Sequence, residues 1–242
     1  MELSSPRMHE SHDAPTPTGR VRLRRKADRG HHDESTIKAI LDEGFICHVG
    51  FPGDDGPVVV PTAYARVGDL LYLHGAVGNA TLRALSAGVP ACVTVTLVDG
   101  LVLARSAFHH SINYRSVVVF GTASEVTDAQ DKRAALTAIV EHLVAGRSAD
   151  ARPPTDEELR ATRVVQMPLG EASAKVRAGG PIDDPEDQCL PVWAGQIPLR
   201  LVAAQPIADI YTPAAVPTPS YVTSYSRRPN PRDPDHRTDP TS

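Results

Sequence analysis

Short runs of strand-forming residues, separated by turn residues, fill the middle of the chain. Three of them follow one another at 45–51, 57–64 and 70–75, and the connections between them read Pro-Gly-Asp-Asp-Gly and Val-Gly-Asp. Such Gly- and Asp-containing connections favour hairpin turns, and strands joined by hairpins are antiparallel. This spacing therefore predicts an antiparallel sheet and argues against a doubly wound fold of alternating strands and helices.

Further strands and small helices continue this pattern toward the C-terminus. Strands are predicted at 91–98 and 101–107, joined by a tight Asp99-Gly100 turn, and then at 114–126, 164–167 and 172–176. Helices are predicted from a cap at Asp33 or Ser35 to a stop at Gly44, at 79–87, at 128–145, and after a capping box at Thr155–Glu158. Six or more short antiparallel strands with small helices between them predict a mainly β fold of the barrel type.

The charge balance and the termini limit the classes of function. The 242 residues include 25 Lys and Arg against 29 Asp and Glu, and this net charge of −4 does not favour nucleic-acid binding. Three scattered cysteines predict a cytoplasmic location, and no apolar run approaches the ~20 residues of a membrane span. We expect a flexible N-terminal arm at 1–20, one domain at 21–211 and a disordered, proline-rich tail at 212–242.

Polar clusters interrupt several of the apolar strands. They are Pro61–Tyr64, His74–Ala76 with Asn79 and Thr81, Arg105–Ser111, and Asn113–Ser116. A buried polar group costs free energy unless it is hydrogen-bonded, so each cluster needs a structural or functional reason. These residues are therefore the candidates for a binding site.

Six motifs in a fixed order carry a resemblance to a known family. They are Val59–Ala65, Leu71–Ala76, Leu103–Ser111, Asn113–Gly121, Ala174–Arg177 and Pro191–Gly195. Together they resemble the flavin-nucleotide-binding branch of the pyridoxamine 5′-phosphate oxidase-like superfamily, over about 24–201. The resemblance implies a six-stranded antiparallel split β-barrel with short flanking helices. It also implies a homodimer that holds flavin mononucleotide (FMN) in a groove shared between the subunits, and some relatives bind haem or a deazaflavin instead.

The resemblance also assigns a cofactor site. The residues that it places at the isoalloxazine ring and ribityl chain are Val60, Pro61, Thr62 and Ala63. Those that it places beside the phosphate are Leu73, His74, Gly75, Asn79, Ala80 and Thr81, with Arg115 and Ser116 reaching the cofactor from the long strand. Free N–H groups at the start of a helix suit a phosphate.

Two departures separate this chain from the oxidase proper. The oxidase carries an Arg-Lys pair at the start of the short helix, where this chain has Ala80-Thr81, so Arg83, Arg105, Arg115 or Lys175 must supply the positive charge. The C-terminal Arg-Leu-His substrate motif is also missing, and only Leu199-Arg-Leu-Val stands near the expected place. Oxidation of pyridoxamine phosphate is therefore not expected.

Several candidates keep two readings. His74 is either a hydrogen-bonded core histidine or a catalytic residue, and Arg115, like Arg105, needs an anionic ligand or a partner carboxylate. Trp193 is either a packing anchor at a dimer seam or a contact of the flavin ring. His109 and His110 are adjacent, which suits a substrate-side loop better than metal chelation, and no metal site is predicted.

These observations lead to two hypotheses of function. The first is an FMN-dependent oxidoreductase in which a small, planar, electron-poor substrate stacks on the flavin near His74 and the His109-His110 loop. A nicotinamide nucleotide would bind only transiently, since no Gly-x-Gly-x-x-Gly motif follows a strand. The second is a non-catalytic flavin- or haem-binding protein on the same barrel, because the histidines make axial ligation of haem possible.

Overall fold

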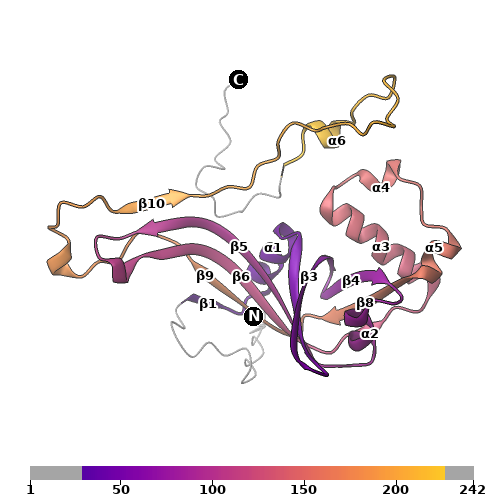
Figure 1. Cartoon of the computed structure of the whole chain (residues 1–242), viewed down its shortest axis with the longest axis horizontal. Coiled ribbons are helices and arrows are strands. Elements are labelled where there is room, and N and C mark those ends of the chain that lie inside the picture. Colours follow the sequence, from indigo (N-terminus) through magenta and orange to yellow (C-terminus); the bar gives the residue numbers. More distant parts are fainter. Residues whose placement is uncertain (1–28, 227–242) are drawn as a thin grey trace, which may run out of the picture.

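The computed structural model describes residues 29–226. Its ten strands form an antiparallel sheet in the order β1-β9-β6-β5-β2-β3-β4-β8-β7, and β10 pairs with β5. Within the described chain the two end strands, β1 and β7, do not pair with each other, so the sheet coils without closing (Figure 1). The predicted mainly β, antiparallel architecture is confirmed, with ten strands in place of six.

The elements have the following bounds. The strands are β1 (Gly30–His31), β2 (Ile46–Gly53), β3 (Gly56–Val67), β4 (Leu70–Ala76), β5 (Ala91–Leu103), β6 (Ser111–Gly121), β7 (Ser124–Glu125), β8 (Thr162–Pro168), β9 (Glu171–Arg177) and β10 (Gly195–Pro198). The helices are α1 (Glu34–Glu43), α2 (Ala80–Ser86), α3 (Ala129–Leu143), α4 (Arg147–Asp150), α5 (Asp156–Ala161) and α6 (Ser220–Thr223). Among these helices, none is long and apolar enough to cross a membrane.

The predicted helix starts are confirmed by their caps. The Asp33 side chain accepts a hydrogen bond from the Thr36 backbone N–H, which identifies Asp33 rather than Ser35 as the cap of α1. Asn79 caps α2 through the Leu82 N–H at 3.1 Å, and Thr155 opens α5 with a complete capping box. Local sequence therefore determines where these helices begin.

The predicted turn at Asp99-Gly100 is wrong. β5 continues through these residues as one long strand, with a register shift between Val98 and Gly100 where it pairs with β6. Gly100 is buried, and a Cβ there would lie 2.9 Å from the Ile197 carbonyl oxygen of β10. The glycine thus allows a close approach of β10 at a bulge, which is the other common use of glycine in a strand.

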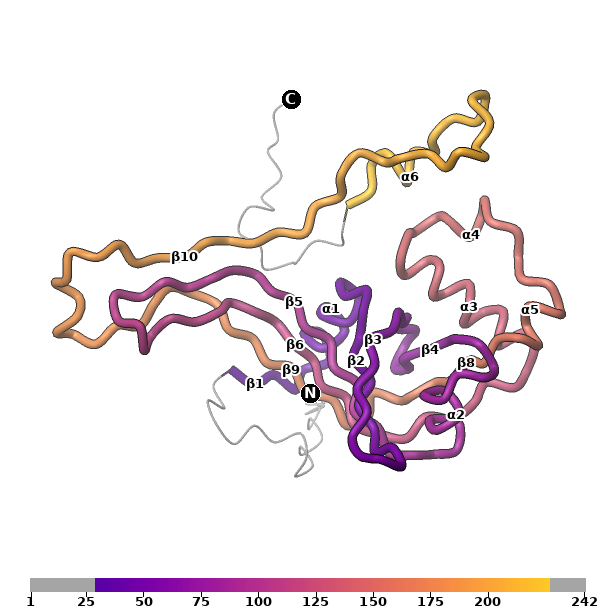
Figure 2. Tube along the Cα trace, in the orientation of Figure 1, coloured from indigo at the N-terminus to yellow at the C-terminus, as the bar shows by residue number. Residues whose placement is uncertain are grey.

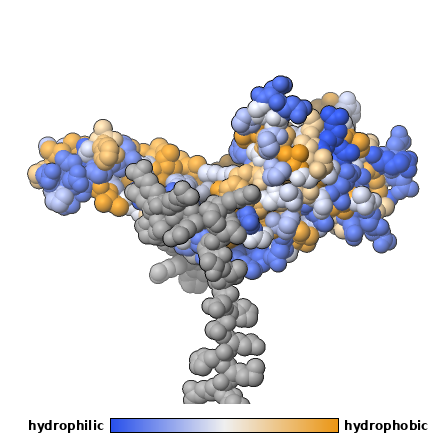
Figure 3. Space-filling view, turned by 90° about the horizontal axis from the view of Figure 1, so that it is seen from below, coloured by the Kyte–Doolittle hydropathy of each residue, from blue (hydrophilic) through white to orange (hydrophobic). Residues whose placement is uncertain are grey.

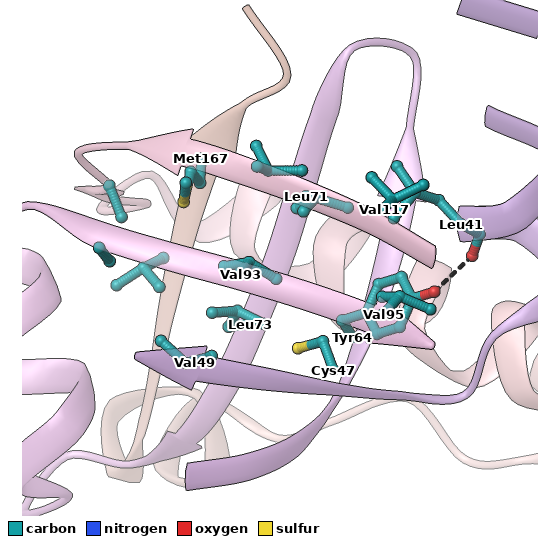
Figure 4. Packing of buried hydrophobic residues seen from close by; sticks show 14 of the residues in the cluster. Leu41, Cys47, Val49, Tyr64, Leu71, Leu73, Val93, Val95, Val117 and Met167 are labelled. Atoms are coloured by element: carbon teal, nitrogen blue, oxygen red, sulfur yellow. Dashed lines mark hydrogen bonds between the residues drawn. The ribbon is translucent and has the colours of Figure 1, made fainter. Parts of the chain in front are cut away.

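The hydrophobic core lies inside the coiled sheet. Tyr64, Leu71, Leu73 and Val93 are almost completely buried there with residues of α1 and α2 (Figure 4). The Tyr64 hydroxyl donates to the Leu41 carbonyl oxygen at 2.6 Å and so joins β3 to α1. A second, smaller cluster packs α3 against β4 and β8 on the other face of the sheet.

A long arm extends from this body. It consists of the distal parts of β5 and β6 (residues 98–114), the loop 178–194 and β10, and it forms the left half of Figure 1. After β10 the chain returns toward the α3–α4 region as an extended segment, 199–219, which we name the strap (Figure 2).

The C-terminal region differs from the sequence-based prediction of disorder from residue 212 onward. Residues 212–226 are described and include α6, where the Tyr221 hydroxyl donates to Asp150 at 2.6 Å and the Tyr225 hydroxyl donates to the Leu143 carbonyl oxygen at 3.0 Å. Two tyrosines thus offer contacts that proline content alone does not reveal. The predicted N-terminal arm, 1–20, and the remainder of the predicted tail, 227–242, lie outside the described residues.

Candidate functional site

Two strand edges face each other where β3 separates from β4. Their ladder runs only from Val67↔Leu70 to Tyr64↔Leu73. Beyond it, residues 56–63 of β3 pair with β2 alone, and His74–Ala76 of β4 pair with β8 alone. Figure 2 shows the β2–β3 hairpin leaving the β4–β8 pair at this point. We call this place the fork.

The fork offers backbone groups to a ligand. No strand of the described chain pairs with its two inner edges, so alternate N–H and C=O groups of residues 57–63 and 74–76 lack a ladder partner. An unpaired edge is a row of donors and acceptors that a planar polar molecule can use. The sequence-predicted cofactor residues on β3 and β4 are thereby brought to one place.

Strand alternation divides these residues between two faces. Ala65 and Tyr72 are directly opposed, so Ala63 and Pro61 lie on the same face as His74. Val60 and Thr62 lie on the face that carries Tyr64 and Leu73, which is the core side. Only Pro61 and Ala63 therefore present side chains next to His74, and the other two offer backbone.

His74 is the titratable group of the fork. Its imidazole is half-buried, and its Nδ1 atom is buried without a hydrogen-bond partner in the described structure. Burial lowers the pKa of His74 below its ordinary value of 6.5. The described chain does not supply Nδ1 with the bond that a purely structural core histidine would have. A neutral imidazole with a free ring nitrogen suits a ligand or a cofactor contact.

Replacing His74 by Leu should remove part of the acid sensitivity of the fold. Because the folded-state pKa of His74 is lowered, the unfolded chain takes up a proton below about pH 6.5 that the folded chain resists, and stability falls as the pH falls. We expect the difference in unfolding free energy between pH 7 and pH 5, measured by urea titration, to be smaller in His74→Leu than in the wild type. The exposed His32→Ala is the control and should keep the wild-type slope.

The turn after β4 is closely packed. A Cβ on Gly75 would lie 2.9 Å from Leu82 Cδ1 and 3.6 Å from Asn79 Nδ2, so the glycine lets α2 approach the end of β4. The Asn79 side-chain oxygen is used for the α2 cap. Ala80 and Thr81 begin that helix, and their predicted contact with a phosphate stays a prediction.

Arg115 has two carboxylate partners of its own. The guanidinium binds Glu43 through Nη1 and Nη2 and Asp99 through Nε and Nη2, at 2.9 Å and 2.7 Å in the Asp99 contacts. Burial lowers the pKa of Arg115, but the bonds to Asp99 and Glu43 outweigh it and raise the pKa above its ordinary value. Partner carboxylates, the second of the two readings, therefore satisfy this arginine. Ser116 follows on the opposite face of β6.

The substrate-side candidates lie on the arm. His109 and His110 belong to the turn between β5 and β6, where His109 Nε2 lies 3.2 Å from Asp184 and His110 Nδ1 lies 3.0 Å from the Ser106 carbonyl oxygen. Trp193 precedes β10 and is 66% exposed. Within one chain the arm and the fork are at separate ends of the molecule (Figure 1), so these residues do not meet His74.

Cys47 is a core residue. It is fully buried, and burial raises the pKa of its thiol to about 12. The prediction that it is a small hydrophobic side chain without thiolate reactivity is confirmed in its burial and pKa.

A family model agrees with this architecture. The model described as pyridoxamine 5′-phosphate oxidase matches residues 33–176, which include the fork and most of the sheet. The chain belongs to this family. No curated protein matches the sequence.

Two solved structures of the pyridoxamine 5′-phosphate oxidase family are similar over nearly their whole length. The flavocytochrome Anf3 from Azotobacter vinelandii is 38% identical, with a TM-score of 0.81 over 85% of this chain and 96% of that one. The FAD and heme binding protein from Mycobacterium smegmatis is 36% identical, with a TM-score of 0.77 over 80% of this chain and 95% of that one. The similarity extends past the family match at residue 176 and therefore into the region after β9.

Sequence reasoning missed two polar residues near this family's predicted cofactor strands. Arg163 of β8 opposes Gly75 and pairs with Glu125 at 3.1 Å. His48 of β2 is exposed and stands in one row with Pro61 and Thr94, so it lies on the same face as Pro61. Its alternation with the buried Cys47 and Val49 was the available signal.

Proposed function

We propose that this protein binds a flavin in the fork between β3 and β4 and uses it in oxidoreductase chemistry. The observation that carries the proposal is the pair of unpaired strand edges beside the unbonded Nδ1 of His74. The printed descriptions of the two similar structures, a flavocytochrome and an FAD and heme binding protein, support the same class of cofactor.

Each part of the fork has a separate role in this proposal. The free edge of β3 donates to and accepts from the isoalloxazine heteroatoms, and Pro61 and Ala63 leave a flat surface for the ring. His74 holds a neutral ring nitrogen against the cofactor or substrate. A bound flavin supplies hydride or single-electron transfer, while the protein contributes orientation and exclusion of water. The substrate is then a small, planar, electron-poor molecule that stacks on the ring.

Haem is the second candidate for this protein. The two relatives at 36% and 38% identity, both described with haem or as a flavocytochrome, favour it. An imidazole nitrogen without a protein hydrogen bond, as in His74, is a suitable axial ligand. The flavin itself is FMN, as the sequence predicts, or FAD, and the two share the ring that the fork would receive.

The visible spectrum of the purified full chain tests the proposal. We expect two flavin bands, an additional Soret band if haem is present, and FMN or FAD in the supernatant after denaturation, identified by mass. His74→Ala should lower the flavin content or shift the Soret band, and Ala63→Leu, which adds bulk on the same face, should lower the flavin content in a folded protein. The matched control His32→Ala should retain the wild-type spectrum. A colourless protein that fails to bind added FMN, FAD or haem would overturn the proposal.

A further inference from the structure

The strap, residues 199–219, is an apolar segment exposed to solvent. Ile207, Ile210 and Tyr211 are 96%, 87% and 83% exposed, and Leu201 and Val202 are also exposed. Only Arg200 and Asp209 are charged in this stretch. Apolar side chains gain roughly 1.5–3 kcal/mol each on full burial, so a segment of this composition is suited to being covered.

Both ends of the strap are attached to the body. At its start, β10 pairs with β5, and the Leu199 N–H donates to the Asp99 carbonyl oxygen at 3.0 Å. At its end, α6 is held by the hydrogen bonds of Tyr221 and Tyr225. Between them, from 201 to 218, the hydrogen bonds within the described chain are local turns at 209–212 and 213–216. The strap is thus positioned by its ends and leaves its apolar side chains unburied (Figure 2).

The arm has the same character. Its exposed large apolar residues include Val98, Leu101, Phe108, Ile112, Trp193 and Ile197. Figure 3 shows apolar surface along the arm between its tip and the body. Together, arm and strap expose on the order of 1,000 Å² of apolar surface, which is comparable with the ~800 Å² that each partner buries in a standard protein interface.

A neutral surface of the same chain complements the strap. The outer face of β2, β3 and β5 carries Ile46 and Val59, 48% and 64% exposed, with His48, Thr94 and Thr96. It has no carboxylate or ammonium side chain in these rows, and a nearly uncharged strap can lie on it without desolvating a charge. Because both surfaces belong to every copy of the chain, a twofold dimer would bury both twice.

We propose that the strap of each protomer wraps onto the outer β2–β3–β5 face of a second copy of this chain, and that this contact holds a homodimer together. The inference goes beyond the proposed function, because it assigns an interaction surface and its occupant whether or not a cofactor binds. The arm, which carries the strap away from its own body, provides the reach that an exchange between protomers needs.

The test is the oligomeric state of the full chain by sedimentation equilibrium. We expect the wild type to be a dimer, and the triple variant Ile207→Ser/Ile210→Ser/Tyr211→Ser to dissociate with a dimer dissociation constant raised at least about 100-fold. These side chains are exposed in the protomer, so their replacement should leave its fold intact. Val59→Asp, on the receiving face, should also dissociate the dimer. The control Val67→Ser/Val77→Ser removes two apolar residues, 48% and 40% exposed, outside both surfaces and should remain dimeric.

Each other outcome overturns the proposal. A monomeric wild type excludes the dimer, and if that monomer sediments with phosphatidylglycerol vesicles, the strap is a membrane contact instead. A triple variant that dimerises as the wild type does shows that the strap is not the contact, even if Val59→Asp dissociates. Flavin content is measured on the same samples. A colourless wild-type dimer would count against the proposed cofactor site and leave the strap contact standing.

Discussion

Replacing Arg115 by Met will destabilise the protein by about 3–5 kcal/mol, because it leaves carboxylates without their counter-ion. The Arg115 and Glu43 side chains are each 9% exposed, and Asp99 is 33% exposed. The guanidinium joins the end of α1 to the bulge in β5, so its loss affects two elements at once. Urea unfolding at pH 7 measures the effect as a shift of the midpoint at an unchanged slope.

Two further variants distinguish an unpaired charge from lost packing. Glu43→Leu in the Arg115→Met background removes the most buried carboxylate together with its partner and should recover a large part of the lost stability. The exposed Arg152→Met, which breaks a surface pair with Glu158, should cost no more than about 1 kcal/mol. A loss below 1 kcal/mol in Arg115→Met would contradict the structural role assigned to the buried network.

Arg115 also marks the limit of inference from sequence. An arginine in an apolar strand predicts an anionic partner, because an unpaired buried charge is too costly. The partner cannot be identified without the fold, since Glu43 lies 72 residues away at the end of α1 and Asp99 lies 16 residues away across the β5–β6 ladder. Resemblance to flavin-binding proteins favoured a cofactor contact, whereas the structure supplies two carboxylates.

Local features were predicted well for the same physical reason. The caps at Asp33, Asn79 and Thr155 depend on side chains that bond to backbone three residues away, so their signal is complete within one turn. The bulge at Asp99-Gly100 depends on β10, which is nearly one hundred residues distant, and local reading took it for a hairpin turn.

The candidate site shows the same division. Residues of β3 and β4 were chosen from the sequence, but their value lies in two edges that stop pairing at Tyr64↔Leu73. Strand pairing is a long-range property, so neither the fork nor the separation of Val60 from Ala63 by face could be read from the motifs alone. His109 and His110 were grouped with His74 because both sequences are polar, and in one chain the arm carries them away from it.

Replacing Gly44 by Ala will cost about 3 kcal/mol, although Gly44 has an ordinary backbone conformation with φ −76°. A Cβ at this position would lie 2.6 Å from both Tyr64 Oη and Val95 Cγ1. Tyr64 and Val95 are fully buried, and the Tyr64 hydroxyl is bonded to the Leu41 carbonyl oxygen. Relief of the overlap therefore requires movement of α1 or loss of that hydrogen bond, and thermal and urea unfolding should both report it.

A matched glycine and a second-site change make the test specific. Gly50→Ala, where the nearest atom to the added Cβ would be 3.7 Å away, should change stability by no more than about 1 kcal/mol. Tyr64→Phe alone should cost about 1–2 kcal/mol for the lost hydrogen bond, and less than that when Gly44 is already Ala, because it also removes one of the two overlapping atoms. If the two substitutions are additive, the overlap with the tyrosine hydroxyl is not what makes Gly44 necessary, and the contact with Val95 would have to carry the whole effect.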